Sequence, residues 1–294
     1  MTPYQIYAVM VLCARDVDVI WHVLDAAGNQ GGNPALPPAG TPGLGYVTAA
    51  SFDALAQLRC DDTIISKGNN VYYGLVLRCH TATAPFVPGD YLVAVRGTMD
   101  TEEWFNDALA LLPRNSPRGP GQVGEGFWDI YDTMTLNDLA GGGAQANVAP
   151  AIAAMVAARP GKVWVVGHSL GAALATYLAA DLQPALKAAA PAVEMDPYFF
   201  ASPKTGTGDY VANYQRTIAT YSLVNYAVDV VPMVPPDLLG YSALNGGGPS
   251  HDVHIISYPT AGGLPNSLAN NHSPVGYARM LDPANAIAAA LPAP

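Results

Sequence analysis

The sequence predicts an α/β fold in which helices flank a mixed, mostly parallel β-sheet. Half of the 294 residues are hydrophobic, which is enough to build a large core, and we expect one domain over 1–294. Strand-like and helix-like segments alternate through the second half of the chain, as expected for helices packed on a sheet. A Gly-His-Ser-Leu-Gly motif also lies between an apolar strand and a small-residue helix.

The first 27 residues predict a helix. Apolar side chains recur at helical spacing from Ile6 to Leu24, and Thr2 before Pro3 is a suitable cap. The segment lacks the basic start of a signal peptide, so we interpret it as structural. We therefore expect a cytoplasmic protein or one exported by a non-standard route.

Further along the chain, β-branched and aromatic runs at 71–79 and 91–95, separated by prolines and a glycine, predict a strand hairpin. The longest apolar run, 163–180, contains His168 and Ser169 and is flanked by loops, so we predict no transmembrane span. The other expected helices are 148–158, 170–182, 209–214 and 273–281, and the other expected strands are 162–166, 194–200, 217–228 and 253–258.

Composition excludes several classes of partner. The chain has 13 Lys+Arg against 23 Asp+Glu, a net charge of −10, and no basic cluster, which disfavours nucleic acid and anionic membrane surfaces. Only 12% of residues are charged, so an uncharged or interfacial partner fits better. Cys13, Cys60 and Cys79 show no zinc-type spacing and specify no disulfide scaffold, although one bridge remains open.

Ser169 is the candidate nucleophile. It is the serine of the Gly-x-Ser-x-Gly motif, and a sharp turn from strand to helix projects such a hydroxyl toward a base and a substrate. Gly167 and Gly171 leave room for that turn. The alternative is that Ser169 only caps the following helix, which would leave both glycines unexplained. His168 is interpreted as structural.

A serine nucleophile needs a histidine base. In hydrolases whose serine lies on such a strand-to-helix turn, the histidine comes later in the chain than the serine. His272 is our first candidate because it lies in a polar loop before the last predicted helix. His251 and His254 are the alternatives, although both lie in or beside a predicted strand. Their His-x-x-His spacing also permits a metal site, which we set aside because no other ligands accompany it.

Asp229 is our candidate for the carboxylate that orients the histidine base. It follows an apolar strand, and functional groups in α/β folds gather at such strand ends. Other aspartates have ordinary interpretations as surface charges or helix caps, namely Asp181, Asp196, Asp209, Asp237 and Asp252.

Acyl transfer also requires backbone N–H groups that face the developing oxyanion. One is expected from Leu170, directly after the nucleophile, and the other from Thr98, after the strand that ends in Arg96-Gly97. The next segment is amphipathic, so it could form a lid over the site. An ordinary surface helix is the alternative interpretation. Its apolar side chains are Met99, Trp104, Phe105, Ala108 and Leu109.

Together these motifs resemble the class 3, or fungal-type, lipases of the α/β-hydrolase fold, over roughly 71–281. Two features depart from that family: three cysteines cannot supply its usual disulfides, and a glycine-rich insertion follows Gly240-Tyr241. The matching residues are Arg96-Gly97-Thr98, Trp104 and Asp107, Gly126-Phe127, Gly167 to Gly171, Ala201 to Gly206, Asp229 with Val231-Pro232 and Pro235-Pro236, and His272 with Tyr277.

The resemblance implies a role for each of these residues. It implies a triad of Ser169, Asp229 and His272, and an oxyanion hole formed by Thr98 and Leu170. It also implies a short helical lid at about 99–111, with Arg96 paired to Asp107 to position it. The lid side chains that would contact substrate are Met99, Trp104, Phe105 and Leu109.

The implied function is carboxylic ester hydrolysis through an acyl-serine, as a triacylglycerol lipase or esterase with no metal or organic cofactor. Phospholipase A1 and feruloyl-type esterase activities occur on the same fold and are the alternatives. A non-catalytic binding module is disfavoured, because every expected catalytic residue is present. We expect an ester or lipid substrate at an oil–water interface, and a monomer or small homo-oligomer; secretion is typical of the family.

Overall fold

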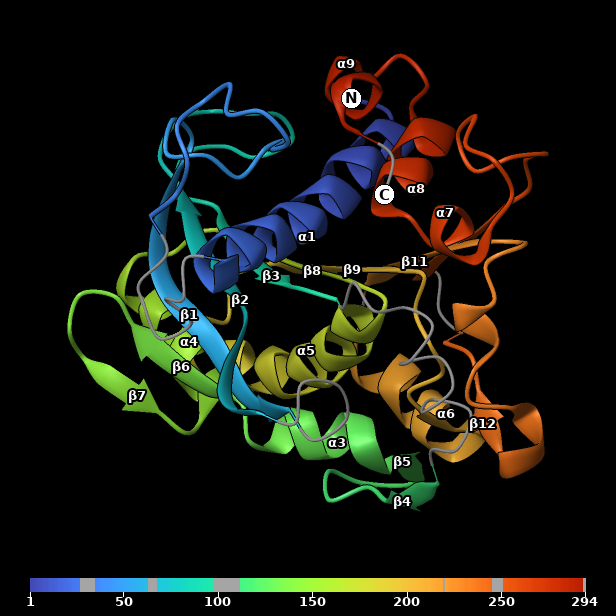
Figure 1. The fold of residues 1–294 in the computed structure, drawn as a ribbon. Coiled ribbons are helices and arrows are strands. Elements are labelled where there is room, and N and C mark those ends of the chain that lie inside the picture. Colours follow the sequence, from blue (N-terminus) through green and yellow to red (C-terminus); the bar gives the residue numbers. More distant parts are fainter. Residues whose placement is uncertain (27–34, 63–67, 98–111, 219, 245–250, 293–294) are drawn as a thin grey trace.

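The computed structural model describes residues 1–26, 35–62, 68–97, 112–218, 220–244 and 251–292. These residues contain a nine-stranded sheet with the order β13-β11-β9-β8-β3-β2-β1-β6-β7 (Figure 1). Its strands are β1 (Phe52–Asp62), β2 (Gly68–Cys79), β3 (Tyr91–Val95), β6 (Thr135–Asp138), β7 (Gly143–Gln145), β8 (Val163–His168), β9 (Met195–Phe200), β11 (Tyr221–Tyr226) and β13 (His251–Ile256).

The sheet is mixed, as the sequence predicts. The five strands from β13 to β3 are parallel, and the strands from β2 to β7 pair antiparallel. Every residue of β3 and β8 is buried, because helices cover both faces of this part of the sheet. The strands and helices expected in the second half of the chain are all present, whereas the sequence pattern does not predict β1, β6 or β7.

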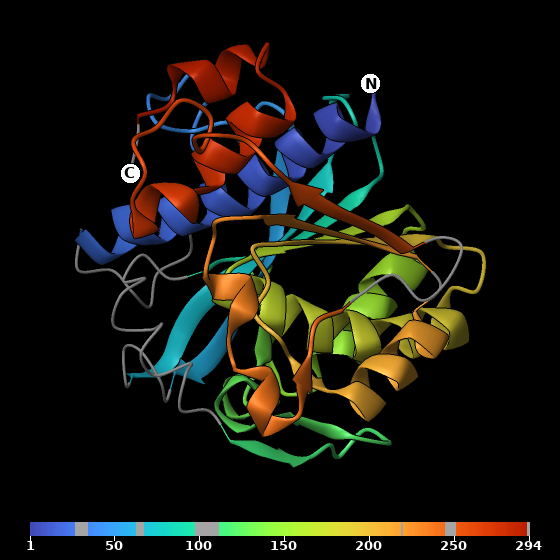
Figure 2. The same cartoon turned by 90° about the vertical axis from the view of Figure 1, so that its right-hand side faces the viewer.

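Helices form a layer on each side of the sheet, which both views show (Figures 1 and 2). One layer contains α1 (Pro3–Ala26), α7 (Leu268–Asn271), α8 (Pro274–Leu281) and α9 (Ala286–Ala290). The opposite layer contains α3 (Glu125–Asp132), α4 (Val148–Ala158), α5 (Leu170–Ala189) and α6 (Gly208–Thr217).

The chain also forms a four-stranded sheet of order β12-β10-β5-β4; in the view of Figure 1, β4 and β5 lie below α3, and β12 lies beside α6. Its short strands are β4 (Pro113–Asn115), β5 (Gln122–Gly124), β10 (Gly206–Thr207) and β12 (Tyr241–Ser242), and two single-turn helices, η1 (Val231–Met233) and η2 (Asp237–Leu239), precede β12. No described helix has the length and apolar character required to cross a membrane.

The predicted N-terminal helix, α1, is part of the core. Its start is capped as expected, since the Gln5 amide donates to Thr2 Oγ1 and the Gln5 side chain accepts from the Thr2 amide. Residues 7–14 are all buried between the sheet and α8. A helix with so little solvent-facing surface belongs to the folded body of the protein.

Asp16 ties α1 to the segment that precedes β1. Its fully buried carboxylate accepts hydrogen bonds of 2.6–2.9 Å from the amides of Gly45, Tyr46 and Val47. Burial nevertheless raises the pKa of Asp16 to about 6, because loss of water disfavours the charged form more than the three donors stabilise it.

The three cysteines are free and buried. Cys13 lies on α1, Cys60 on β1 and Cys79 on β2, so each packs as a small apolar side chain in the core. The single disulfide that the sequence left open is absent.

Candidate active site

The turn between β8 and α5 presents Ser169. Its backbone has φ +60° and ψ −132°, a strained conformation for a residue with a Cβ, and its amide donates to the Phe200 carbonyl. Both flanking glycines are required: a Cβ on Gly167 would overlap the carbonyl of Gly171, and one on Gly171 would overlap that of Arg96. The motif therefore forms the tight strand-to-helix turn expected from the sequence.

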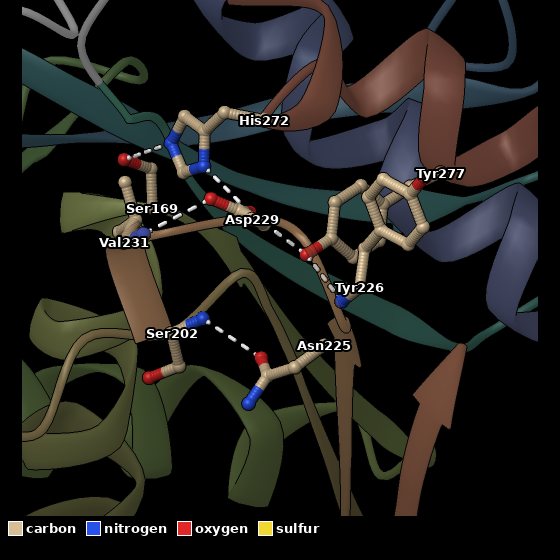
Figure 3. Close-up of polar contacts among 8 residues, drawn as sticks. All are labelled: Ser169, Ser202, Asn225, Tyr226, Asp229, Val231, His272 and Tyr277. Carbon is tan, nitrogen blue, oxygen red and sulfur yellow. Dashed lines mark hydrogen bonds and ion pairs between the residues drawn. The ribbon is translucent and has the colours of Figure 1, made fainter. Parts of the chain in front are cut away.

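Ser169, His272 and Asp229 form one hydrogen-bonded chain (Figure 3). Ser169 Oγ lies 2.7 Å from His272 Nε2, and His272 Nδ1 lies 2.9 Å from Asp229 Oδ2. An ionised carboxylate only accepts hydrogen bonds, so the imidazole carries its proton on Nδ1 and leaves Nε2 free to accept from the serine. All three side chains are buried, with residue exposures of 1–3%.

Asp229 lies just after the end of β11 and is held by more than the histidine. The Val231 amide donates to Oδ1 at 3.0 Å, and the Tyr277 hydroxyl donates to Oδ2 at 2.8 Å. Tyr277 in turn accepts from the Tyr226 amide at 2.8 Å. Burial and the nearby Asp229 charge raise the pKa of Tyr277 well above its usual value, so the hydroxyl stays a donor.

His272 is positioned by a short helical connection. Its backbone N–H caps the C-terminus of α7 by donating a hydrogen bond to the Leu268 carbonyl, and the next residue, Ser273, caps the N-terminus of α8 with its side chain. The imidazole faces that of His168, with ring centroids 4.6 Å apart. Burial holds the pKa of His168 well below its usual value, so it packs as a neutral ring.

The alternative histidine, His254, has other partners than Ser169. Its Nε2 lies 3.2 Å from the Tyr7 hydroxyl and 3.4 Å from Asp252 Oδ1, on the edge strand β13 under α1. Tyr7 also donates to Asp252 at 2.6 Å. His251 lies on β13, and its side chain is outside the described part. Where the structure describes the chain, no group of three His, Cys, Asp or Glu side chains could hold a metal ion.

Three alternative acids have structural partners. Asp181 pairs with Arg118 and accepts from Tyr131, and Asp237 pairs with Lys204. Asp196 pairs with Lys162. None of these described pairs includes a histidine.

The residues expected at the oxyanion side are only partly described. Leu170 begins α5, so its amide is among the first-turn N–H groups that have no acceptor within the helix. Thr98 lies outside the described residues, and so do the lid segment at 99–111 and its members Met99, Trp104, Phe105, Asp107 and Leu109. Arg96 is buried, and its described ionic partner is Asp18.

Sequence reasoning missed two supports of the site. The sequence marks Tyr277 only as an aromatic residue near His272, and nothing local indicates that its hydroxyl reaches Asp229. Asn225 accepts a 3.2 Å bond from the Ser202 amide and so ties the end of β11 to the segment after β9 (Figure 3). Each contact joins separate elements, so no sequence spacing encodes it.

Comparisons with known proteins identify the class first. The chain resembles the lipase of Rhizopus microsporus var. chinensis with a TM-score of 0.58 and 19% identity, over 82% of this chain and 72% of that one. It resembles the Rhizomucor miehei triacylglyceride lipase with a TM-score of 0.56 and 18% identity, over 87% and 82%. These similarities show the fold of the chain, which is the α/β-hydrolase fold.

The family follows from sequence comparison. The profile of the family described as Lipase (class 3) matches residues 92–239, half of the chain, and the protein belongs to this family. A Fusarium solani protein named secreted mono- and diacylglycerol lipase 1 is 30% identical over 226 residues, which are 72% of this chain and 62% of that protein. Phospholipase A1-II 7 of Oryza sativa subsp. indica is 32% identical over 52% of this chain and 42% of that protein.

The match to these curated relatives is partial. The chain spans less than two thirds of the length of the Fusarium protein and less than half of the rice protein. The matched region shows the family of this protein, and it does not by itself show the substrate or the activity of the whole protein.

Proposed function

We propose that the protein is a carboxylic ester hydrolase that acts on lipid esters through an acyl-serine intermediate. The observation that carries this proposal is a chain of two hydrogen bonds. Ser169 Oγ lies 2.7 Å from His272 Nε2, and His272 Nδ1 lies 2.9 Å from Asp229 Oδ2. In this role Ser169 is the nucleophile, His272 the general base and acid, and Asp229 the group that orients the imidazole.

The reaction follows from these positions. Ser169 Oγ attacks the ester carbonyl while its proton moves to His272 Nε2, and the Leu170 amide donates to the oxyanion that forms. The intermediate collapses, the C–O bond to the alcohol breaks, and the alcohol leaves with the proton from His272. Water then adds to the acyl-serine by the same route and releases the carboxylic acid. In this scheme Thr98 supplies the second oxyanion donor.

The class of ester is proposed to be a glycerolipid. Both the Fusarium relative and the rice relatives carry names of glycerolipid hydrolases, the former a mono- and diacylglycerol lipase and the latter phospholipases A1. A low content of charged residues, 12%, suits a protein that meets an oil–water interface. Phospholipase A1 activity is the second candidate, supported by the similarity to the rice proteins.

The test is a series of esters from acetyl to long acyl chains, both dissolved and emulsified, with phosphatidylcholine vesicles as a further substrate. Wild type and Ser169→Ala are assayed side by side. A long-chain preference with a rise in rate above the solubility limit supports the lipase, and release of the sn-1 acyl chain from the vesicles supports the phospholipase. Equal rates for wild type and Ser169→Ala on every ester would overturn the proposal.

A further inference from the structure

The backbone of Arg96 and Gly97, at the end of β3, lies directly against the nucleophile elbow. A Cβ added to Gly97 would lie 2.8 Å from the His168 carbonyl oxygen and 3.2 Å from Ser169 Cβ. On the other side, a Cβ on Gly171 would overlap the Arg96 carbonyl. With so little space between the two segments, a shift of the β3 end would be transmitted to Ser169.

The side chain of Arg96 folds back to hold this strand end. Its Nε donates to the Tyr72 carbonyl at 2.7 Å, and its Nη1 donates to the carbonyl of Gly97 at 2.9 Å. The second bond holds the carbonyl of Gly97, at the point where the described part of this segment ends. The sequence places a predicted oxyanion donor at the next residue, Thr98.

The guanidinium is itself held by α1. The guanidinium carbon lies 5.0 Å from the ring centroid of Trp21 on α1 and 4.7 Å from that of Tyr73 on β2, so the cation contacts two aromatic rings. Asp18, also on α1, lies 3.6 Å from Nη1. The side chains of Arg96 and Asp18 are only 8% and 13% exposed, which keeps water from replacing either partner.

We propose that α1 acts through Arg96 to position the end of β3 at the reacting centre, so that Arg96, Asp18 and Trp21 are positioning residues for acyl transfer. The proposal rests on the proposed function of Ser169. It gives the N-terminal helix a role in the reaction in addition to its packing in the core. Arg96 touches no reacting atom; it acts by holding the Gly97 carbonyl and the end of β3 against Ser169.

The experiment measures how fast a fluorophosphonate labels Ser169, a reaction that needs the activated serine and no particular ester. Arg96→Lys keeps the positive charge but cannot reproduce both hydrogen bonds of the planar group, so the labelling rate constant should fall about 10- to 100-fold. Asp18→Asn keeps the size of the side chain and loses its charge, with an expected fall of about 3- to 10-fold.

The matched control is Arg78→Lys. Arg78 also lies over an aromatic ring, that of Tyr91 at 5.7 Å, but Tyr91 is at the opposite end of β3 from Gly97. This variant should be labelled within about 2-fold of wild type. The double variant Arg96→Lys/Asp18→Asn should be no slower than Arg96→Lys alone, because both substitutions act through one contact.

Two readouts separate positioning from loss of folding. Rate constants are determined per labelled site, so unfolded molecules do not contribute, and the midpoint of the pH dependence should stay at the wild-type value because the Ser169–His272 pair is untouched. Folded Arg96→Lys labelled at the wild-type rate would overturn the proposal. If Arg96→Lys does not fold, a wild-type rate for Asp18→Asn overturns it instead.

The proposed function and this inference fail in different ways. If wild type is labelled but hydrolyses no ester of the series, the proposed substrate class fails, while the ratio of labelling rates between variants still decides the role of Arg96. If wild type is not labelled at all, Ser169 is not activated and both proposals are overturned.

Discussion

The Tyr277 hydroxyl donates to the same carboxylate oxygen of Asp229 that faces His272. The two distances to Oδ2 are 2.8 and 2.9 Å, while the Val231 amide occupies Oδ1 at 3.0 Å. Asp229 therefore has three donors in a buried setting, which fixes its rotamer and sets how strongly it attracts the imidazolium.

Tyr277→Phe should lower kcat about 10-fold with little change in KM. A carboxylate with one donor fewer holds the imidazole less firmly in the orientation that Ser169 needs, so the loss should fall on the chemical step. Steady-state kinetics on a short soluble ester measure both kcat and KM. Tyr226→Phe is the control, because the Tyr226 hydroxyl donates to the Tyr258 carbonyl and not to Asp229. Equal kcat values for the two variants would show that the Tyr277 hydroxyl has no role in the reaction.

His272→Ala and Ser169→Ala should each lower kcat by about 10⁴-fold or more, because the two residues act as a unit. His254→Ala should retain more than about half of the wild-type kcat, since its imidazole contacts Tyr7 and Asp252 instead of Ser169. Hydrolysis of a short soluble ester, normalised to folded protein, gives the ranking. A larger loss in His254→Ala than in His272→Ala would reassign the base.

Gly97→Ala should reduce kcat about 100-fold, since the added methyl group would lie 2.8 Å from the His168 carbonyl oxygen and displace the elbow. Gly208→Ala is the matched control. A Cβ there meets only Ser242 Oγ, at the ordinary distance of 3.5 Å. Wild-type kcat in folded Gly97→Ala would show that the elbow tolerates this displacement.

Asp16 should make stability decrease as pH rises. Its pKa is about 6 in the folded protein against 3.8 as the reference value, so between these two values the folded state binds more protons than the unfolded state. The contribution is most favourable below about pH 4 and is lost by about pH 6, at a cost of up to about 3 kcal/mol. Asp16→Asn should remove this slope from urea unfolding curves.

Exposed Asp53 supplies the control for that measurement. Asp53→Asn should leave the slope of stability between pH 4 and pH 6 as in wild type. An unchanged slope in Asp16→Asn would mean that the carboxyl of Asp16 titrates in the folded protein as it does in the unfolded chain.

The sequence by itself determined the α/β class and nominated the chemistry. The fold prediction is confirmed. It was possible because the apolar strand before Ser169 and the small-residue helix after it each show a local periodicity along the sequence. The three nominated residues Ser169, His272 and Asp229 are also brought together by the structure, in the order typical of this fold.

The supports of the site were decided only by the tertiary structure. Tyr277 reaches Asp229, and Arg96 meets Asp18 and Trp21, through contacts between elements that lie dozens of residues apart. The same holds for β1, whose pairing with β2 and β6 extends the sheet. Spacing along a chain reports periodicity and turns, whereas long-range hydrogen bonds and stacked rings depend on how the layers pack, so only the folded molecule defines them.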